Sequence, residues 1–359
     1  MLSPREAVRM LPSYHPPLGG RDGLRLDFNE NTIGCSPRVL NCLRHVGMEQ
    51  LARYPEREPV EAAVADFFGI AASQLLLTNG VDEAIHLLCQ THLEPGDEAL
   101  IVVPTYSMYR IYIMATGAQI IAIPAGKGFC FPTDEVCNCI TPRTRLIAIA
   151  NPNNPTGTVA PQQDLLRLAA SAPDSAILVD EAYFEFYGQT LLPKCREFPN
   201  LFVARTFSKA YGLAGLRIGA LIGNTDQIHS VRRVSSPYNV NAVALACLPE
   251  AIADQTYIQH YVNEIRESRT RLEQALEASG IYFWPSEANF VLARVRSTAF
   301  IEQMRRRGIL IRDRSNDQGC EGCVRITLGP RAHTDRLLAA LQETLEELGM
   351  TQEQGASPA

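Results

Sequence analysis

One lysine in the sequence lies where it could bond covalently to a carbonyl compound. Lys209 follows the apolar run LFVART (201–206) and is not part of a Gly-x-x-x-x-Gly-Lys nucleotide loop. If that run is a strand of an open α/β sheet, Lys209 lies at the carboxyl end, where such sheets bind ligands. A lysine there can form an imine with an aldehyde cofactor. Taken alone, Lys209 could equally be an exposed lysine in an ion pair.

Two further groups of residues could bind one phosphate. The hydroxyls of Thr206 and Ser208 and the planar guanidinium of Arg217 lie close to Lys209 in the sequence. The segment TNGVDEAI (78–85) predicts a strand, a glycine turn and the start of a helix, where backbone N–H groups bind anions. The residues at this predicted turn are Gly80, Val81 and Asp82.

An aspartate at the end of another apolar run narrows the choice of cofactor. Asp180 closes AILVD (176–180), and a carboxylate in such a place is costly unless it has a charged partner. The protonated pyridine nitrogen of pyridoxal phosphate (PLP) would be that partner, and it makes the ring an electron sink. Tyr183, three positions on, could hydrogen-bond the ring hydroxyl. The alternative is that Asp180 caps a turn.

Two more strand ends carry polar or aromatic residues. NPNNPTG (151–157) follows the run RLIAIA, and its prolines and glycine predict a rigid loop. The amide of Asn154 could donate to the oxygen of a ring hydroxyl. PTYSMY (104–109) follows EALIVV and offers Tyr106 for stacking on a ring.

The strands that would position these residues are predicted from short apolar runs. They cover residues 75–79, 98–103, 119–123, 145–150, 176–180, 201–206 and 217–223. Amphipathic helical segments lie between several of them, including 81–93 and 161–170. This alternation predicts an α/β fold in which helices sandwich a mostly parallel sheet. Since the candidate PLP residues lie at its strand ends, we interpret it as a large PLP-binding domain.

The pattern changes after about residue 238. A helix is expected over 254–279, then short strands near 290–294, 309–312 and 323–328, and a closing helix over 333–348. A chain of 359 residues is long enough for two domains. We assign 45–245 to the large domain, and 1–44 with 246–359 to an N-terminal arm and a small α+β domain. The segment before Arg44 has loop character.

Composition excludes several other classes of protein. There are 33 Lys and Arg against 39 Asp and Glu, with no basic excess for nucleic acid. No apolar run approaches the roughly 18 residues of a membrane span, and the first residues do not resemble a secretion signal. The ten cysteines are scattered, which suits reduced thiols in the cytoplasm. No metal site is predicted, although Cys137 with Cys139 and Cys320 with Cys323 form close pairs.

In combination and in this order, the motifs resemble fold-type I aminotransferases of class I/II, and more closely the histidinol-phosphate aminotransferases. The resemblance runs from LDFNEN (26–31) to VRITLG (324–329). It also includes RYPE (53–56) and GILIRDRS (308–315).

The resemblance implies a role for each candidate. Lys209 would hold PLP and move a proton, Asp180 would hold the pyridinium, and Tyr106 would stack on the ring. Asn154 and Tyr183 would bind the ring hydroxyl. The residues implied around the cofactor phosphate are Gly80, Val81, Asp82, Thr206, Ser208 and Arg217. The resemblance also implies a homodimer in which Tyr54 of RYPE reaches the neighbouring subunit's phosphate.

Two arginines bear on the substrate. The resemblance places Arg325 on a substrate carboxylate and Arg312, with Arg325, on the phosphate of histidinol phosphate. Either arginine could instead form a surface ion pair. Asn31, in the segment that helps close the pocket, is a further substrate-binding candidate. The implied reaction converts histidinol phosphate and 2-oxoglutarate to imidazole acetol phosphate and glutamate, a step of histidine biosynthesis.

Three alternatives stay open at this point. The chain could be an aromatic amino acid aminotransferase or a threonine-phosphate decarboxylase, both of which use PLP. From another class, it could be a nicotinamide-dependent oxidoreductase, although no Gly-x-Gly-x-x-Gly lies between a first strand and helix.

Overall fold

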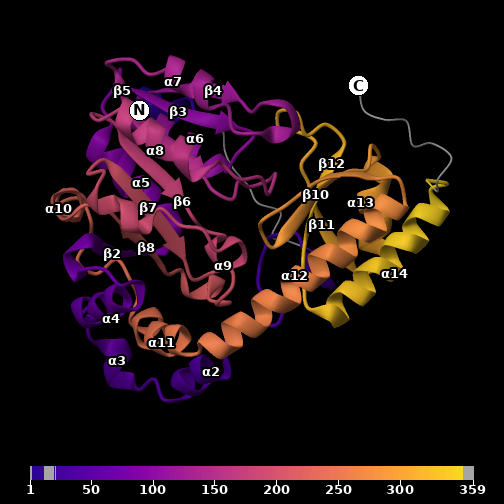
Figure 1. Cartoon of the computed structure of the whole chain (residues 1–359). Helices are drawn as coiled ribbons and strands as arrows, with labels where there is room; N and C mark the ends of the chain where they lie inside the picture. Colours follow the sequence, from indigo (N-terminus) through magenta and orange to yellow (C-terminus); the bar gives the residue numbers. More distant parts are fainter. Residues whose placement is uncertain (1, 12–19, 21, 351–359) are drawn as a thin grey trace.

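The computed structural model describes residues 2–11, 20 and 22–350, which contain two β-sheets (Figure 1). The larger sheet has seven strands in the order β2-β8-β7-β6-β5-β3-β4. Only β8 runs antiparallel to its neighbours, so the expectation of a mostly parallel sheet is confirmed. Its strands are β2 (Leu75–Thr78), β3 (Glu98–Val103), β4 (Gln119–Pro124), β5 (Thr144–Ala150), β6 (Ala176–Asp180), β7 (Leu201–Thr206) and β8 (Gly219–Ile222).

Both faces of this sheet are buried. Along β6, Ile177 and Val179 join one apolar cluster while Leu178 joins the other, because successive side chains of a strand point to opposite faces. This two-sided burial explains why the strands read as continuous apolar runs. One face packs against α5 (Gly80–His92), α6 (Ser107–Thr116) and α10 (Thr225–Arg232), the other against α4 (Glu58–Phe68) and α8 (Gln162–Ser171).

The smaller sheet has five strands in the order β1-β11-β12-β10-β9. They are β1 (Leu24–Leu26), β9 (Tyr282–Trp284), β10 (Phe290–Arg294), β11 (Ile309–Asp313) and β12 (Cys323–Thr327). Its neighbouring helices are α12 (Gln255–Ala278), α13 (Thr298–Arg306) and α14 (Arg331–Glu347). The long α12 runs from the region of α11 (Ala242–Ala253) to α14 beside this sheet (Figure 1).

The N-terminal segment is more regular than expected. The prediction of loop character before Arg44 is correct for residues 27–36 and wrong for α1 (Glu6–Arg9), β1 and α2 (Pro37–Arg44). Ser36 caps α2 by accepting a hydrogen bond from the N–H of Arg38, and Pro37 occupies the first helical position. The prolines and glycine at 12, 16, 17 and 19 lie outside the described residues. The domain boundaries at 45 and 246 stay a prediction.

Short elements complete the fold. They are α3 (Met48–Ala52), α7 (Thr133–Asn138), α9 (Phe184–Tyr187), η1 (Ala72–Gln74), η2 (Lys127–Phe129), η3 (Leu192–Arg196) and η4 (Ala214–Leu216). Within residues 2–11, 20 and 22–350, no helix has the length and apolar character needed to span a membrane.

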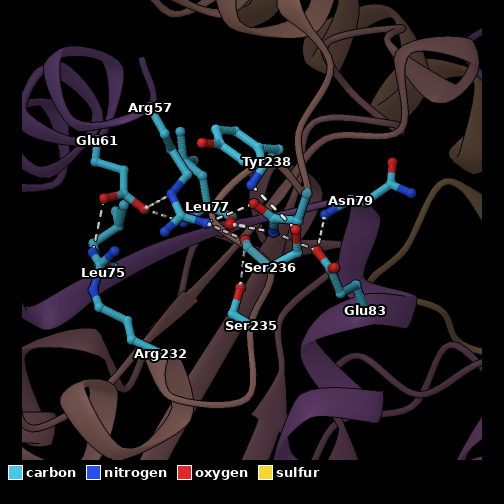
Figure 2. Close-up of polar contacts among 11 residues, drawn as sticks. Arg57, Glu61, Leu75, Leu77, Asn79, Glu83, Arg232, Ser235, Ser236 and Tyr238 are labelled. Atoms are coloured by element: carbon cyan, nitrogen blue, oxygen red, sulfur yellow. Dashed lines mark hydrogen bonds and ion pairs between the residues drawn. The ribbon is translucent and has the colours of Figure 1, made fainter. Parts of the chain in front are cut away.

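Side chains close the outer edge of β2, which is the first strand of the larger sheet. The N–H of Leu77 donates to Glu61 Oε1 (2.9 Å), and its carbonyl accepts from Asn239 Nδ2 (3.0 Å) (Figure 2). Glu61 is only 3% exposed and forms ion pairs with Arg57 (3.2 Å) and Arg232 (2.8 Å). These contacts satisfy backbone groups that an unprotected edge strand would leave open.

We expect Glu61→Ala to destabilise the fold by about 3–5 kcal/mol, because it leaves the buried Arg57 without its carboxylate partner. Urea unfolding followed by circular dichroism measures the change. The control is Glu302→Ala, which breaks an exposed pair with Arg306 and should cost less than about 1 kcal/mol. Equal losses in the two variants would show that the Glu61 network adds nothing special to stability.

Candidate active site

A cavity of about 390 Å³ lies at the carboxyl ends of β5, β6 and β7. This is where open α/β sheets bind ligands, and the volume suits a small molecule. Its walls are formed by Phe28, Glu30, Val81, Asp82, Tyr106, Ala150, Pro152, Asn154, Asp180, Ala182, Tyr183, Thr206, Ser208, Lys209, Ala214, Gly215 and Arg217.

Most of the residues selected from the sequence meet at this cavity. Those that line it are Val81, Asp82, Tyr106, Asn154, Asp180, Tyr183, Thr206, Ser208, Lys209 and Arg217. Those that do not line it are Gly80, Tyr54, Asn31, Arg312 and Arg325. Among the described residues, no group of three or more His, Cys, Asp or Glu side chains could hold a metal ion.

Lys209 has a side chain suited to covalent chemistry. Its ammonium Nζ donates to the carbonyl of Phe28 (3.1 Å). Burial, and after it the positive charge of Arg325, lower the pKa of Lys209 to about 8. A substantial fraction of the amine is therefore neutral, and hence nucleophilic, in mildly alkaline solution.

Asp180 is held by two hydrogen bonds. Its Oδ2 accepts from the hydroxyl of Tyr109 (2.8 Å), and its Oδ1 accepts from the N–H of Ala182 (3.1 Å). Burial raises the pKa of Asp180 to about 6, and the hydrogen bond from Tyr109 opposes that rise. Tyr109 thus helps to keep the carboxylate ionised near neutral pH. Sequence reasoning missed Tyr109, although its spacing of three residues from Tyr106 places both on one side of α6.

Asp82 connects the groups expected to bind phosphate. Its Oδ2 pairs with Arg217 Nη2 (2.9 Å), and its Oδ1 accepts from the hydroxyl of Tyr106 (2.8 Å). Gly80 has φ +76°, and a Cβ there would lie 2.6 Å from Arg217 Nη2, so a larger residue would be strained and would displace the guanidinium. The guanidinium of Arg217 has further N–H donors with which it could bind a phosphate beside Asp82.

The hydrogen bonds drawn in Figure 2 hold the first turn of α5 in place. Glu83 Oε2 accepts from the N–H of Asn79 (2.6 Å) and from Asn239 Nδ2 (2.6 Å). Asn239 also accepts from Arg57 Nη1 (2.6 Å), which joins this turn to the edge of β2. The N–H groups that begin α5 are therefore held in place beside the cavity.

Arg325, on β12 of the smaller sheet, contacts Asn154 of the cavity wall. Its Nη1 donates to Asn154 Oδ1 (2.5 Å) and its Nη2 to the carbonyl of Asp27 (2.7 Å). It is 6% exposed, and burial lowers its pKa to about 10. The hydroxyl of Tyr183 accepts from Asn29 Nδ2 (2.9 Å), so its own proton remains free to donate. Asn29 was not selected from the sequence.

The remaining candidates lie around this site. The guanidinium of Arg312 lies 5.4 Å from the ring centre of Phe28, and Arg312 is directly opposite Arg325 in the β11–β12 ladder. Asn31 donates to the carbonyl of Ala210, next to Lys209, and accepts from the N–H of Ile33 and of Gly34.

Tyr54 lies on the surface. It is 77% exposed and stacks on Tyr238 with ring centres 4.2 Å apart. Its predicted role requires a second subunit, which the single chain does not contain.

Residues 21–341 match the sequence family described as aminotransferase class I and II. The chain belongs to this family. The aminotransferase is 33% identical to the histidinol-phosphate aminotransferase of Geobacillus sp. (strain WCH70), over 95% of this chain and 97% of that protein. It is 34% identical to histidinol-phosphate aminotransferase 1 of Nostoc sp. (strain PCC 7120), over 95% and 98%. The family prediction is confirmed, and membership of this family excludes the nicotinamide-dependent oxidoreductase alternative.

Solved structures agree with this fold. The histidinol-phosphate aminotransferase of Sinorhizobium meliloti in complex with pyridoxal-5'-phosphate superposes with a TM-score of 0.85 at 26% identity, covering 96% of this chain and 97% of that one. The aspartate aminotransferase of Thermus thermophilus with maleate superposes with a TM-score of 0.82 at 23% identity, covering 96% and 100%. The second match supports the fold alone.

In the cofactor-free aminotransferase, we expect Lys209 to react with formaldehyde and a hydride donor with a pH midpoint near 8, since only the neutral amine reacts. NMR of ¹³C-methylated lysines measures this. An unperturbed lysine amine would give a midpoint of about 10.4. Arg325→Gln removes a charge that disfavours the ammonium and should raise the Lys209 midpoint, while Arg306→Gln should not. A Lys209 midpoint at the unperturbed value would contradict the inferred environment.

Proposed function

We propose that this aminotransferase binds PLP in the cavity and transfers the amino group of histidinol phosphate to 2-oxoglutarate, giving imidazole acetol phosphate and glutamate. One observation carries the proposal: Lys209, whose pKa is lowered to about 8, and the buried carboxylate of Asp180 line the same cavity at neighbouring strand ends. The names of the relatives support the choice of substrate.

The residues of the cavity fit PLP. Lys209 would hold the aldehyde carbon, and Asp180 would pair with the pyridine nitrogen. The hydroxyls of Thr206 and Ser208, the guanidinium of Arg217 and the first turn of α5 offer donors for a phosphate. When bound, the cofactor supplies an electron-withdrawing ring that stabilises negative charge on the substrate carbon.

The chain's own residues would hold, orient and move protons. The amine of Lys209 can accept a proton and return it within the cavity, because a pKa lowered to about 8 makes both protonation states accessible near neutral pH. Asp180 keeps a pyridine nitrogen protonated, and Tyr109 supports the ionised carboxylate. Since Asn154 Oδ1 is taken by Arg325, its Nδ2 is the atom left to donate to a ring hydroxyl.

Arg325 and Arg312 would bind the anionic end of the substrate. They lie opposite each other on neighbouring strands, and their planar guanidinium groups suit two-point contact with carboxylate or phosphate. The Nε of Arg325 is buried and has no hydrogen-bond partner in the described part of the chain, so a bound anion could satisfy it.

A second copy of the chain is part of the proposal. Tyr54 and Tyr238 are exposed, as are Met48 (89%) and Leu51 (62%) of the neighbouring α3. An apolar surface of this kind suits a subunit contact. In the homodimer Tyr54 would reach the cofactor phosphate of the other subunit. A cytoplasmic location is proposed with it.

A half-reaction tests the function. We expect histidinol phosphate, added without keto acid to the PLP-loaded protein, to abolish the visible absorbance of the lysine-bound cofactor. Lys209→Ala should lack that absorbance and all turnover. Loss of absorbance with phenylalanine but not with histidinol phosphate would make the substrate assignment wrong. Release of carbon dioxide from threonine phosphate, which has the carboxyl group that histidinol phosphate lacks, would instead indicate a decarboxylase. Retained turnover in Lys209→Ala would overturn the role of Lys209.

Tyr54→Phe tests the shared site. We expect it to weaken PLP binding roughly tenfold, because a hydrogen bond to a charged group contributes about 1.5–3 kcal/mol. Binding of pyridoxal, which has no phosphate, should not change, and fluorescence titration measures both. Sedimentation should give a dimer for wild type and variant. A monomer at micromolar concentration, or equal losses for the two ligands, would contradict the proposed contact.

A further inference from the structure

A third arginine shares a face of the small sheet with Arg312 and Arg325. Arg312 lies opposite Arg325. The N–H of Arg314 donates to the carbonyl of Cys323 (3.0 Å), which continues the ladder one residue beyond Asp313. Because side chains alternate along a strand, Arg312, Arg314 and Arg325 project from the same face. It is the face from which Arg325 reaches Asn154 at the cavity.

Arg314 is buried and acts on groups of the cavity wall. Its side chain is 14% exposed, and its Nε is buried without a hydrogen-bond partner among the described residues. Burial raises the pKa of Tyr183, and the charges of Arg325 and Arg314 oppose that rise. Arg314 also lowers the pKa of Arg325, in the same direction as burial. These effects agree with the strand geometry, which places Arg314 on the face that carries Arg325.

Asp317 neutralises part of this positive charge. Its carboxylate pairs with Arg314, and the charges of Arg314, Arg325 and Arg312 all act to lower its pKa, against the larger effect of burial. The loop is fixed by turns, with the N–H of Asp317 bonded to the carbonyl of Arg314 (2.9 Å). The carboxylate of Asp317 thus lies beside the group of three arginines that an incoming anion would bind.

We propose that Arg314 is a specificity-determining residue that binds the phosphate of the substrate together with Arg312, and that Asp317 competes with this phosphate for Arg314. The inference rests on the proposed function. A phosphate dianion has enough oxygens to engage two guanidinium groups and can displace a single carboxylate. An uncharged aromatic side chain gains nothing from Arg314, so the residue favours phosphate-bearing amino donors over aromatic amino acids.

The half-reaction of the PLP-loaded protein separates these donors. Arg314→Gln should raise the concentration of histidinol phosphate that gives half-maximal reaction by roughly ten- to a hundredfold, as expected for loss of a charge-assisted hydrogen bond. The value for phenylalanine should not change. Arg314→Lys should lie between wild type and Arg314→Gln, because it keeps the charge and loses the planar fork.

Asp317→Asn should change the half-maximal concentration of histidinol phosphate in the opposite direction. It removes the competing carboxylate and should lower the half-maximal concentration of histidinol phosphate without altering that of phenylalanine. The matched control is Arg306→Gln, which removes an exposed arginine of α13 and should leave both values unchanged. Thermal unfolding of each variant shows whether the fold is retained.

Binding of inorganic phosphate, measured by calorimetry on the PLP-loaded protein, gives a readout that does not depend on turnover. We expect Arg314→Gln to weaken it and Asp317→Asn to strengthen it. Equal effects on both donors, or no effect of Arg314→Gln on phosphate binding, would overturn the inference. If no amino donor reacts with the wild type, the proposed function fails, and the calorimetry still decides the role of Arg314.

Discussion

The burial of charged groups at the carboxyl end of the parallel sheet is the constraint on which the rest of the structure depends. Asp180 and Arg325 are 5% and 6% exposed, and a buried charge is costly unless it is paired or hydrogen-bonded. Tyr109 and the N–H of Ala182 support Asp180, while Asn154 and a carbonyl of the N-terminal segment support Arg325. The cavity therefore needs elements from both sheets and from the first 31 residues.

The sequence was sufficient to predict the strand ends but not the contacts between them. Strands 176–180 and 201–206 were placed to the residue, because two-sided burial gives continuous apolar runs that stop at a polar residue. The three-residue strand β1 was not predicted, because it is formed by pairing with β11, which lies near the other end of the chain. The site roles of Tyr109 and Asn29 were not predicted for a related reason. Their partners, Asp180 and Tyr183, are distant in sequence and come near only in the folded protein.

The N-terminal segment positions the arginines of the small sheet. β1 extends that sheet beside β11, and the backbone N–H of Asn29 donates to Thr327 Oγ1 (3.0 Å) just after Arg325. Asn289 Nδ2 donates to the carbonyl of Asn29 (3.2 Å), which completes a buried polar cluster. The predicted grouping of residues 1–44 with the small domain stays a prediction, since these contacts involve only residues 24–29. The contacts mean that a change near Asn29 can shift the anion-binding face without touching an arginine.

Lys209 lies between two positively charged regions, and this arrangement links anion binding to its basicity. Arg325 on the small-sheet side and Arg217 on the side of α5 both lower the pKa of Lys209, in addition to burial. Before anions bind, the amine is neutral more often and so better able to attack an aldehyde. An anion bound to either arginine offsets its charge and raises the pKa of a free Lys209 amine. The same lysine thus becomes a better proton acceptor once the anionic groups of cofactor and substrate are in place, which is the order in which the two properties are needed.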